Sequence, residues 1–503
     1  MSKFGQKLDN FFEISARQST IKTEIMGGLT TFFAMCYIML VNPSTMSGGK
    51  MGDPIFNAIY IATAIGAIVG TLLMALYAKM PFAQASGMGL NAFFFVSFML
   101  FGFADTEPFS VEAYSVGLSV IFVSGIVFMI LSVTGLRKKI AEALPDCLKK
   151  AIPAGIGLFI AFIGLKNAGI IEANQFTFVQ LVNLNVFSGD VTWYKIAPAI
   201  AALFGVFVIA ALSKTKLGKA NVIVGILVTT GLYYLFNIGN DAAFANIGAN
   251  INPGNAFKDF GTIGVQGWFK GFQHWQGTTI LSVIMLIITF CLVDMFDTLG
   301  TLQGAAAEAG MLDENGNPHN LDKCLMADST ATVVGSMVGT STVTTFVESA
   351  SGVSAGARTG LSSVVVAFMF FIAMFLTPVA AIVPLAATAP ALIYVGVLML
   401  KNIKEVDFND MTNAVPAFLT LIMMPLTYSI SNGIAVGMIS YMVLKFFEVF
   451  FVKQEVVIPS TVEGEEPTVV KKFIIKDYFA IGRVRLVTSS RRILSFLLSL
   501  SYS

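Results

Sequence analysis

The segment Leu292–Gly360 decides the fold, and its three apolar stretches read VDMFDTLGT (293–301), MADSTATVVGSMVGT (326–340) and TTFVESASGVSAGA (344–357). Together these stretches carry four carboxylates, Asp294, Asp297, Asp328 and Glu348. Only 12% of the residues in the chain are charged, and an acid at the centre of a membrane helix costs roughly 2.5 to 3.5 kcal/mol. The Gly and Ser residues around the acids favour broken helices. The segment therefore predicts a polar site inside a membrane, as in a transporter.

The composition predicts a polytopic membrane protein. The chain has 503 residues, of which 55% are hydrophobic, and apolar runs of about 18 to 20 residues, the length that crosses a bilayer, recur along it. The formal net charge of +1 leaves no basic surface for a nucleic acid. We expect fourteen spans, at 25–41, 58–78, 84–100, 115–135, 150–170, 195–213, 220–236, 278–300, 325–341, 345–357, 361–380, 388–400, 413–430 and 433–451.

The cysteine and histidine residues argue against disulfides and a metal site. The four cysteines, Cys36, Cys147, Cys291 and Cys324, are scattered without a paired spacing, so we expect free buried thiols. The two histidines stand alone in polar connections. We expect no metal and no cofactor other than a coupling ion. The first residues lack the apolar region of a signal peptide, so the N-terminus is expected to be retained.

Charged residues predict the orientation of the spans. Lysine and arginine precede span 1 and fill the connections between spans 4 and 5 and between spans 6 and 7, whereas acids fill the connection between spans 3 and 4. By the positive-inside bias, both termini are cytoplasmic and the protein lies in the cell membrane as a multi-pass protein. The connection 237–277 would then be external, with Trp268 and Trp275 as interface anchors.

An internal repeat is visible in the sequence. ATAIGAIVGT (62–71) is matched by ATVVGSMVGT (331–340), and ASGMGLNA (85–92) is matched in the same order by ASGVSAGA (350–357). Small residues also recur in packed membrane helices without duplication, but several matches in one order favour a duplicated unit. Spans 1–7 then correspond to spans 8–14, and because seven is odd, the second copy enters the membrane from the opposite side. An inverted repeat places its site at mid-membrane.

The predicted fold is all-α, with two inverted repeats and short extended segments in spans 3 and 10. The predicted parts are a cytoplasmic N-terminus (1–24), a first repeat (25–236), an external loop (237–277), a second repeat (278–451) and a cytoplasmic tail (452–503). The end of the tail is apolar but too short to span, and is expected to lie on a surface as an amphipathic segment.

Two half-helices are predicted to meet at the site. In span 3, Gly87 and Gly89 permit an extended or left-handed backbone before a helix. In span 10, residues 344–347 have strand propensity, and Ser349 and Ser351 begin a helix. The two helix starts would aim free N–H groups at one point. Such a point suits a polar, planar ligand.

Glu348 and Asn91 are the predicted ligand contacts of these two segments. Glu348 lies at the junction of the extended part and the half-helix, where it can accept two hydrogen bonds from adjacent ring N–H groups. The alternative is a helix-start acid satisfied by nearby amides. Asn91 can donate and accept together, or it can join two helices.

The aspartates are predicted to carry a proton or to orient the site. Asp294 and Asp297 are three residues apart on one helix flank. We assign Asp297 to the site and Asp294 to a packing network. Burial and a neighbouring acid disfavour the charged form, as a proton-coupled carrier requires. Asp328 either orients the site or caps the helix that it opens.

Five motifs resemble the AzgA-like purine permeases of the nucleobase–cation symporter group: TTFFAMCYIMLVNP (30–43), QASGMGLNAFF (84–94), MFDTLGTL (295–302), the stretch 327–361 and MMPLTYSISNGIA (423–435). The resemblance covers roughly residues 10–450 and not the end of the tail. It implies the uracil-transporter fold, with a core domain of spans 1–4 and 8–11 and a gate domain of spans 5–7 and 12–14.

The resemblance also implies a function. It implies symport of guanine, hypoxanthine or adenine with protons, by an elevator-like alternating-access mechanism in a homodimer that associates through the gate domain. It places four residues at family positions tied to substrate binding or transport: Asn91, Asp297, Asp328 and Glu348.

Other functions stay open at this point. An anion carrier, or a carrier of xanthine or uracil, on the same fold is one alternative; an anion site would require a basic residue, and the nearest, Arg358, lies ten residues beyond Glu348. A membrane-embedded hydrolase would need a nucleophile with a base or metal ligands, and neither histidine lies in a predicted span. We therefore do not expect an enzyme.

Overall fold

The fold is known from a computed structural model that is almost wholly helical. It describes residues 3–48, 53–103, 105–134, 145–174, 177–183, 193–215, 220–244, 253–275, 280–309, 311–312, 318–376, 382–451, 454–458 and 468–472. The amphipathic segment predicted at the end of the chain lies outside the described residues. The chain folds into two compact units, residues 1–137 with 156–400, and residues 138–155 with 401–503. The division into core and gate domains stays a prediction.

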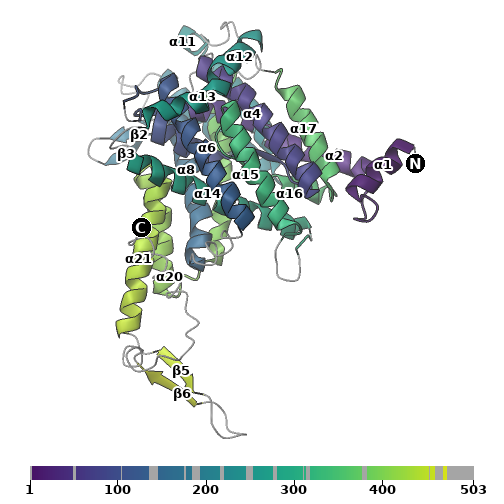
Figure 1. The fold of residues 1–503 in the computed structure, drawn as a ribbon. Helices are drawn as coiled ribbons and strands as arrows, with labels where there is room; N and C mark the ends of the chain where they lie inside the picture. Colours follow the sequence, from purple (N-terminus) through teal and green to yellow (C-terminus); the bar gives the residue numbers. More distant parts are fainter. Residues whose placement is uncertain are drawn as a thin grey trace. The chain divides into compact units, whose positions relative to one another are not determined.

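The elements before residue 237 are α1 (Lys3–Phe12), α2 (Ile21–Met35), α3 (Ile38–Ser47), α4 (Pro54–Leu73), the π-turn η1 (Met74–Ala78), β1 (Gln84–Ser86), α5 (Met88–Phe94), the π-turn η2 (Phe95–Met99), α6 (Val111–Thr134), α8 (Asp146–Asn167), β2 (Ile171–Asn174), β3 (Phe178–Leu181), α9 (Trp193–Leu212) and α10 (Asn221–Phe236). Figure 1 shows α4 and α6 gathered in one bundle with α14 (Ile280–Ala309) and α15 (Leu321–Val338).

The later elements are α11 (Asp241–Phe244), α12 (Pro253–Asp259), η5 (Phe260–Gly264), α13 (Val265–Lys270), η6 (Gly271–His274), α14 (Ile280–Ala309), α15 (Leu321–Val338), β4 (Val343–Thr345), α16 (Ser349–Ser354), α17 (Gly360–Ala373), α19 (Leu385–Met399), η8 (Leu400–Glu405), α20 (Met411–Leu426), α21 (Ile430–Phe451), β5 (Gln454–Ile458) and β6 (Thr468–Lys472). Every predicted span contains a helix. In the described part of the chain, six helical segments have the length and apolar character to cross a membrane. The total of fourteen spans stays a prediction.

The predicted external loop 237–277 contains short helices that its polar sequence did not reveal. They form because their aromatic residues pack on the bundle: the Trp268 ring lies 4.4 Å from that of Phe122 on α6. The indole N–H of Trp275 also donates to Ser119 Oγ at 3.0 Å. Both tryptophans therefore fasten this connection to α6.

A short antiparallel ribbon joins the two halves of the sequence. β1 pairs with β4, with Gln84 opposite Thr345 and Ser86 opposite Val343. Strand β4 begins one residue and ends two residues earlier than the predicted 344–347. The chain turns into α16 directly after Phe346, whose N–H bonds to the carbonyl of Ala83. The pairing brings together the extended segments that precede α5 (Met88–Phe94) and α16 (Ser349–Ser354). The inverted repeat itself stays a prediction.

The repeated small-residue motifs pack against each other where α4 meets α15. A Cβ atom on Gly70 would lie 3.0 Å from the Ala331 Cβ, and one on Gly66 would lie 3.0 Å from Thr340 Cγ2. These glycines let the two helices approach closely beside the ribbon. The two matching motifs therefore meet in one helix contact.

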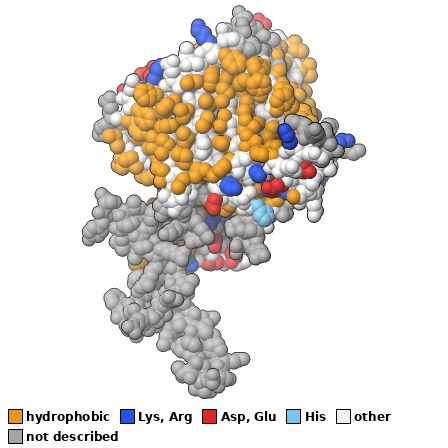
Figure 2. Space-filling view, turned by 45° about the vertical axis from the view of Figure 1, so that its right-hand side comes forward, with side chains coloured by type: hydrophobic (Ala, Val, Ile, Leu, Met, Phe, Trp, Pro, Cys, Tyr) orange, Lys and Arg blue, Asp and Glu red, His pale blue; other side chains and the backbone are white. Residues whose placement is uncertain are grey.

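The surface agrees with a membrane protein. Figure 2 shows a broad hydrophobic face with its charged side chains toward the margins. Large exposed apolar side chains lie on α9, α14 and α17, among them Phe207, Leu281 and Phe368. Such a surface would be costly in water and is matched by lipid.

The second unit contains the helical hairpin α20–α21 and the two-stranded sheet β5–β6. The hairpin is tight because Gly433 faces α20, where an added Cβ would lie 2.3 Å from Met424 Cγ and 2.8 Å from the Thr420 carbonyl. Asp410 begins α20 as its N-cap and accepts from the Thr412 N–H at 2.9 Å.

Candidate functional site

The β1–β4 ribbon positions the site because each strand leads into a short helix. α5 has seven residues and follows Gly87, and α16 has six residues and follows Glu348. Helices this short are not stable alone and depend on tertiary contacts. The predicted pair of half-helices is therefore present, and its geometry is set by the surrounding bundle.

Glu348 occupies the N-cap position of α16, but its carboxylate makes no capping hydrogen bond. Instead the Tyr37 hydroxyl donates to Glu348 Oε1 at 2.5 Å. The backbone N–H of Glu348 also interacts with the carboxylate, so the choice between a ligand contact and a helix-start acid satisfied by nearby amides stays a prediction. The side chain is partly exposed, so the carboxylate can receive a further donor.

Tyr37 was missed by reasoning from the sequence. It is fully buried and lies in the short break between α2 and α3. The only signal was its place in the motif 30–43. A buried tyrosine in an apolar span usually has a hydrogen-bond partner for its hydroxyl, but the residues near Tyr37 in the sequence do not identify Glu348 as that partner.

Asp297 and Glu348 are brought together. Asp297 lies on α14, which packs against α16, and its charge interacts with that of Glu348. Both side chains are partly exposed, whereas Asp294 and Asp328 are 1% and 0% exposed. The four acids thus divide into an accessible pair and a buried pair.

Asp328 joins three elements from within the bundle. Gln84 Nε2 of β1 donates to its Oδ1 at 2.9 Å, and Thr298 Oγ1 of α14 donates to its Oδ2 at 2.6 Å. The interpretation of Asp328 as a helix cap is wrong, because α15 begins at Leu321 and Asn320 is its N-cap. The longer helix leaves Asp328 in an interior turn, where it bonds to its neighbours. Its role in orienting the site or in proton coupling stays a prediction.

Asp294 belongs to a packing network, as predicted. Thr332 Oγ1 of α15 lies 3.0 Å from Asp294 Oδ2 and also accepts from the Val343 N–H at 3.2 Å. The network connects α14 and α15 to β4. A role of Asp294 in proton coupling stays a prediction.

Asn91 is 1% exposed, and its side chain is used inside the protein. Its carbonyl oxygen accepts from Ser86 Oγ at 2.9 Å and from the hydroxyl of Ser341. Asn91 therefore joins α5 to β1 and to the segment just before β4, rather than to a second helix. Its contact with a ligand stays a prediction.

The three small residues assigned to the site differ in accessibility. The Gly87 backbone is extended (φ −69°) rather than left-handed, and its N–H bonds to the Thr342 carbonyl at 3.0 Å. Ser349 is buried, and its Oγ accepts from the Ala83 N–H at 3.0 Å. Ser351 is partly exposed on α16. Of the three, only Ser351 is accessible; substrate binding by any of them stays a prediction.

The basic residue nearest to Glu348 in the sequence has internal partners. Arg358 Nη1 donates to the carbonyls of Val353 and Ala357, at 2.6 and 2.7 Å. In the described ranges, no group of three or more His, Cys, Asp or Glu residues is arranged to hold a metal ion. The charge of the site is therefore dominated by carboxylates.

Known proteins share both the sequence and the fold of this chain. Residues 22–436 match Xan_ur_permease, described as a permease family. The guanine/hypoxanthine permease PbuG of Bacillus subtilis is 40% identical over 86% of this chain and 93% of its own, and the adenine permease AdeQ of Escherichia coli is 37% identical over 87% and 90%.

Among solved structures, the transmembrane domain of the cyanobacterial bicarbonate transporter BicA superposes with a TM-score of 0.57 at 15% identity, over 84% of this chain and 97% of that one. This likeness concerns the fold alone. It confirms the predicted all-α polytopic membrane architecture, and the sequence relatives confirm the predicted resemblance to purine permeases, which are transporters and not enzymes. The chain belongs to the Xan_ur_permease family of membrane permeases.

Proposed function

We propose that this protein takes up purine nucleobases, namely guanine, hypoxanthine or adenine, across the cell membrane together with protons. The observation that carries the proposal is the accessible pair Asp297 and Glu348, on helices α14 and α16 that pack beside the β1–β4 ribbon. Relatives with 40% and 37% identity are named as guanine/hypoxanthine and adenine permeases.

The chemistry of Glu348 suits a purine edge. Guanine presents a ring N–H beside an exocyclic amine, and a carboxylate accepts from both. Adenine presents a different pattern of donors and acceptors, so the placement of Glu348 decides which purine is preferred. A buried polar group left unpaired costs about 1 to 3 kcal/mol, which is enough for strong discrimination.

Proton coupling is assigned to the acids of the same site. Asp297 and Glu348 are accessible to a proton and to substrate, while Asp294 and Asp328 interact with Asp297 from the buried side. Protonation of this cluster on one side of the membrane and release on the other would couple the two fluxes. The proposal includes elevator-like alternating access, a homodimer through the gate domain, and two cytoplasmic termini.

An anion carrier on the same fold is disfavoured by charge. Carboxylates dominate the site, and the guanidinium of Arg358 donates to protein carbonyls. An anion would therefore meet uncompensated negative charge.

Competitive uptake tests the proposal. Labelled hypoxanthine uptake is measured against unlabelled guanine, adenine, xanthine and uracil at two external pH values. We expect purines to compete, uptake to rise at the lower external pH, and Glu348→Gln to abolish uptake. Glu112→Gln, on the exposed first turn of α6, serves as the matched control. Unaltered uptake by Glu348→Gln would refute the site; equal uptake at both pH values would refute the coupling; competition by xanthine or uracil alone would refute the substrate class.

A further inference from the structure

Helix α2 contacts the Glu348-bearing half-helix α16 at both of its ends. At the near end, Tyr37 follows the last turn of α2 and donates to Glu348 Oε1. Tyr37 is fully buried, so its ring cannot swing away without disturbing the bundle. This hydrogen bond occupies Glu348 Oε1, and it thereby fixes the direction in which the other carboxylate oxygen points.

The middle of the contact is a backbone approach that only glycine allows. A Cβ on Gly352 of α16 would lie 2.1 Å from Thr31 Oγ1 and 2.6 Å from the Gly27 carbonyl. A Cβ on Gly27 would lie 3.1 Å from the Gly352 carbonyl. The two helices are therefore in backbone contact, and α16 cannot shift toward α2.

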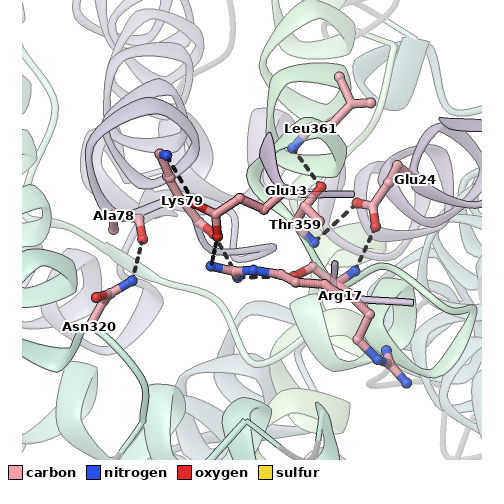
Figure 3. A network of polar contacts seen from close by, with 9 residues as sticks. Glu13, Arg17, Glu24, Ala78, Lys79, Asn320, Thr359 and Leu361 are labelled. Atoms are coloured by element: carbon pink, nitrogen blue, oxygen red, sulfur yellow. Dashed lines mark hydrogen bonds and ion pairs between the residues drawn. The ribbon is translucent and has the colours of Figure 1, made fainter. Parts of the chain in front are cut away.

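At the far end, a buried acid of α2 holds the turn that follows α16. Glu24 is 0% exposed, and its two carboxylate oxygens accept from the N–H groups of Arg358 at 2.9 Å and Thr359 at 3.2 Å (Figure 3). Thr359 is also the N-cap of α17. Burying a carboxylate is costly unless donors surround it, so these two amides and Glu24 stabilise one another.

The surrounding network fastens the same turn from outside. Arg17 Nη1 donates to the backbone carbonyls of Lys79 at 3.1 Å and Arg358 at 3.3 Å, and Glu13 lies 3.7 Å from Arg17 and 3.4 Å from Lys79 (Figure 3). The Glu13 pairs are solvent-exposed, so they contribute little to stability. Glu24 is the buried carboxylate of the network, and both of its oxygens accept from backbone N–H groups beyond α16.

We propose that Tyr37 and Glu24 are positioning residues for Glu348. Their contacts hold the six-residue helix α16 against α2, so that the Glu348 carboxylate is presented to substrate in one fixed orientation. The inference rests on the proposed substrate contact of Glu348. It adds that binding strength and purine preference depend on Glu24 of α2 and on Tyr37, which follows α2. Since α16 is too short to be stable alone, its orientation is set by its contacts with α2.

Uptake kinetics of Tyr37→Phe and Glu24→Gln test this, with rates divided by the amount of transporter in the membrane. Losing a hydrogen bond to a carboxylate should raise KM about tenfold, while the maximal rate per transporter changes less than about threefold. The ranking of guanine, hypoxanthine and adenine as competitors should also change. Tyr60→Phe is the control for the tyrosine, since the buried Tyr60 hydroxyl donates only to the Ala373 carbonyl, at 2.9 Å. Glu13→Gln is the control for the glutamate.

A KM and a ranking equal to wild type in Tyr37→Phe would overturn the inference, as would a lower maximal rate with an unchanged KM. A tenfold rise in Tyr60→Phe or Glu13→Gln would also overturn it, because the effect would then be general. If Glu24→Gln does not reach the membrane, Glu24→Asp replaces it. The shorter carboxylate of Glu24→Asp should raise KM, and a KM equal to that of the wild type would contradict the positioning role of Glu24. Absence of purine uptake by the wild type would instead refute the proposed function.

Discussion

The backbone contact between α2 and α16 yields the sharpest prediction. In Gly352→Ala the new methyl group would lie 2.6 Å from the Gly27 carbonyl oxygen and 2.1 Å from Thr31 Oγ1. The threonine hydroxyl can rotate away, but the carbonyl belongs to the backbone of α2. Restoring an ordinary contact of about 3.4 Å requires a separation of roughly 3.4 − 2.6 = 0.8 Å between the helices. We expect this displacement to be passed to Glu348.

The magnitude follows from the geometry. Overpacking of this kind costs roughly 1 to 3 kcal/mol, and misplacement of a site group by about 1 Å can cost on the order of a hundredfold in function. The control is Gly231→Ala on α10, where a Cβ meets nothing within 4 Å. Both variants gain the same helix propensity, roughly 1 kcal/mol. The difference between them therefore isolates the clash.

Two measurements decide the matter. Thermal unfolding of the purified protein should show Gly352→Ala less stable than Gly231→Ala, and the uptake KM should rise at least tenfold in Gly352→Ala alone. Equal midpoints and equal KM values in the two variants would refute the reasoning, because the helices would then have room for a methyl group that the structure denies them.

Three further predictions concern stability and accessibility. Thr298→Val removes the donor to Asp328 Oδ2 and should cost roughly 1.5 to 3 kcal/mol of stability. Its unfolding midpoint should be lower than that of the control Thr289→Val, since the Thr289 hydroxyl donates to the Met285 carbonyl of its own helix. Equal midpoints would contradict this prediction. The Thr412 hydroxyl lowers the pKa of Asp410 below its usual 3.8. The α20 cap therefore stabilises the fold fully above pH 3.8, and this stabilisation is lost as the pH falls through the lowered pKa. Asp410→Ala should cost roughly 1 kcal/mol at neutral pH and remove this acid dependence, which unfolding midpoints measured against pH would show. All four cysteines are buried and free, so a membrane-impermeant maleimide should label them only after unfolding, and rapid labelling of the native protein would contradict their burial.

Several features could be predicted because they are local. Apolar runs and the glycine, serine and proline residues that interrupt them depend on neighbouring residues, so each predicted span contains a helix and the extended segments appear within two residues of their predicted place. The acid-rich segment was recognisable because a carboxylate in an apolar run is costly and therefore indicates a functional role. The capping alternative for Asp328 was wrong because helix boundaries are less well determined than helix existence.

The sequence by itself determined that this chain is a polytopic membrane protein and that its acids gather near two breaks in the helices; the duplication of one unit stays a prediction. Only the tertiary structure decided which acids are accessible, and that Glu348 takes its orientation from a tyrosine 311 positions away. The physical reason is that hydrophobicity and backbone preference act over a few residues, whereas a buried hydrogen bond exists only where packing brings a distant donor and acceptor together.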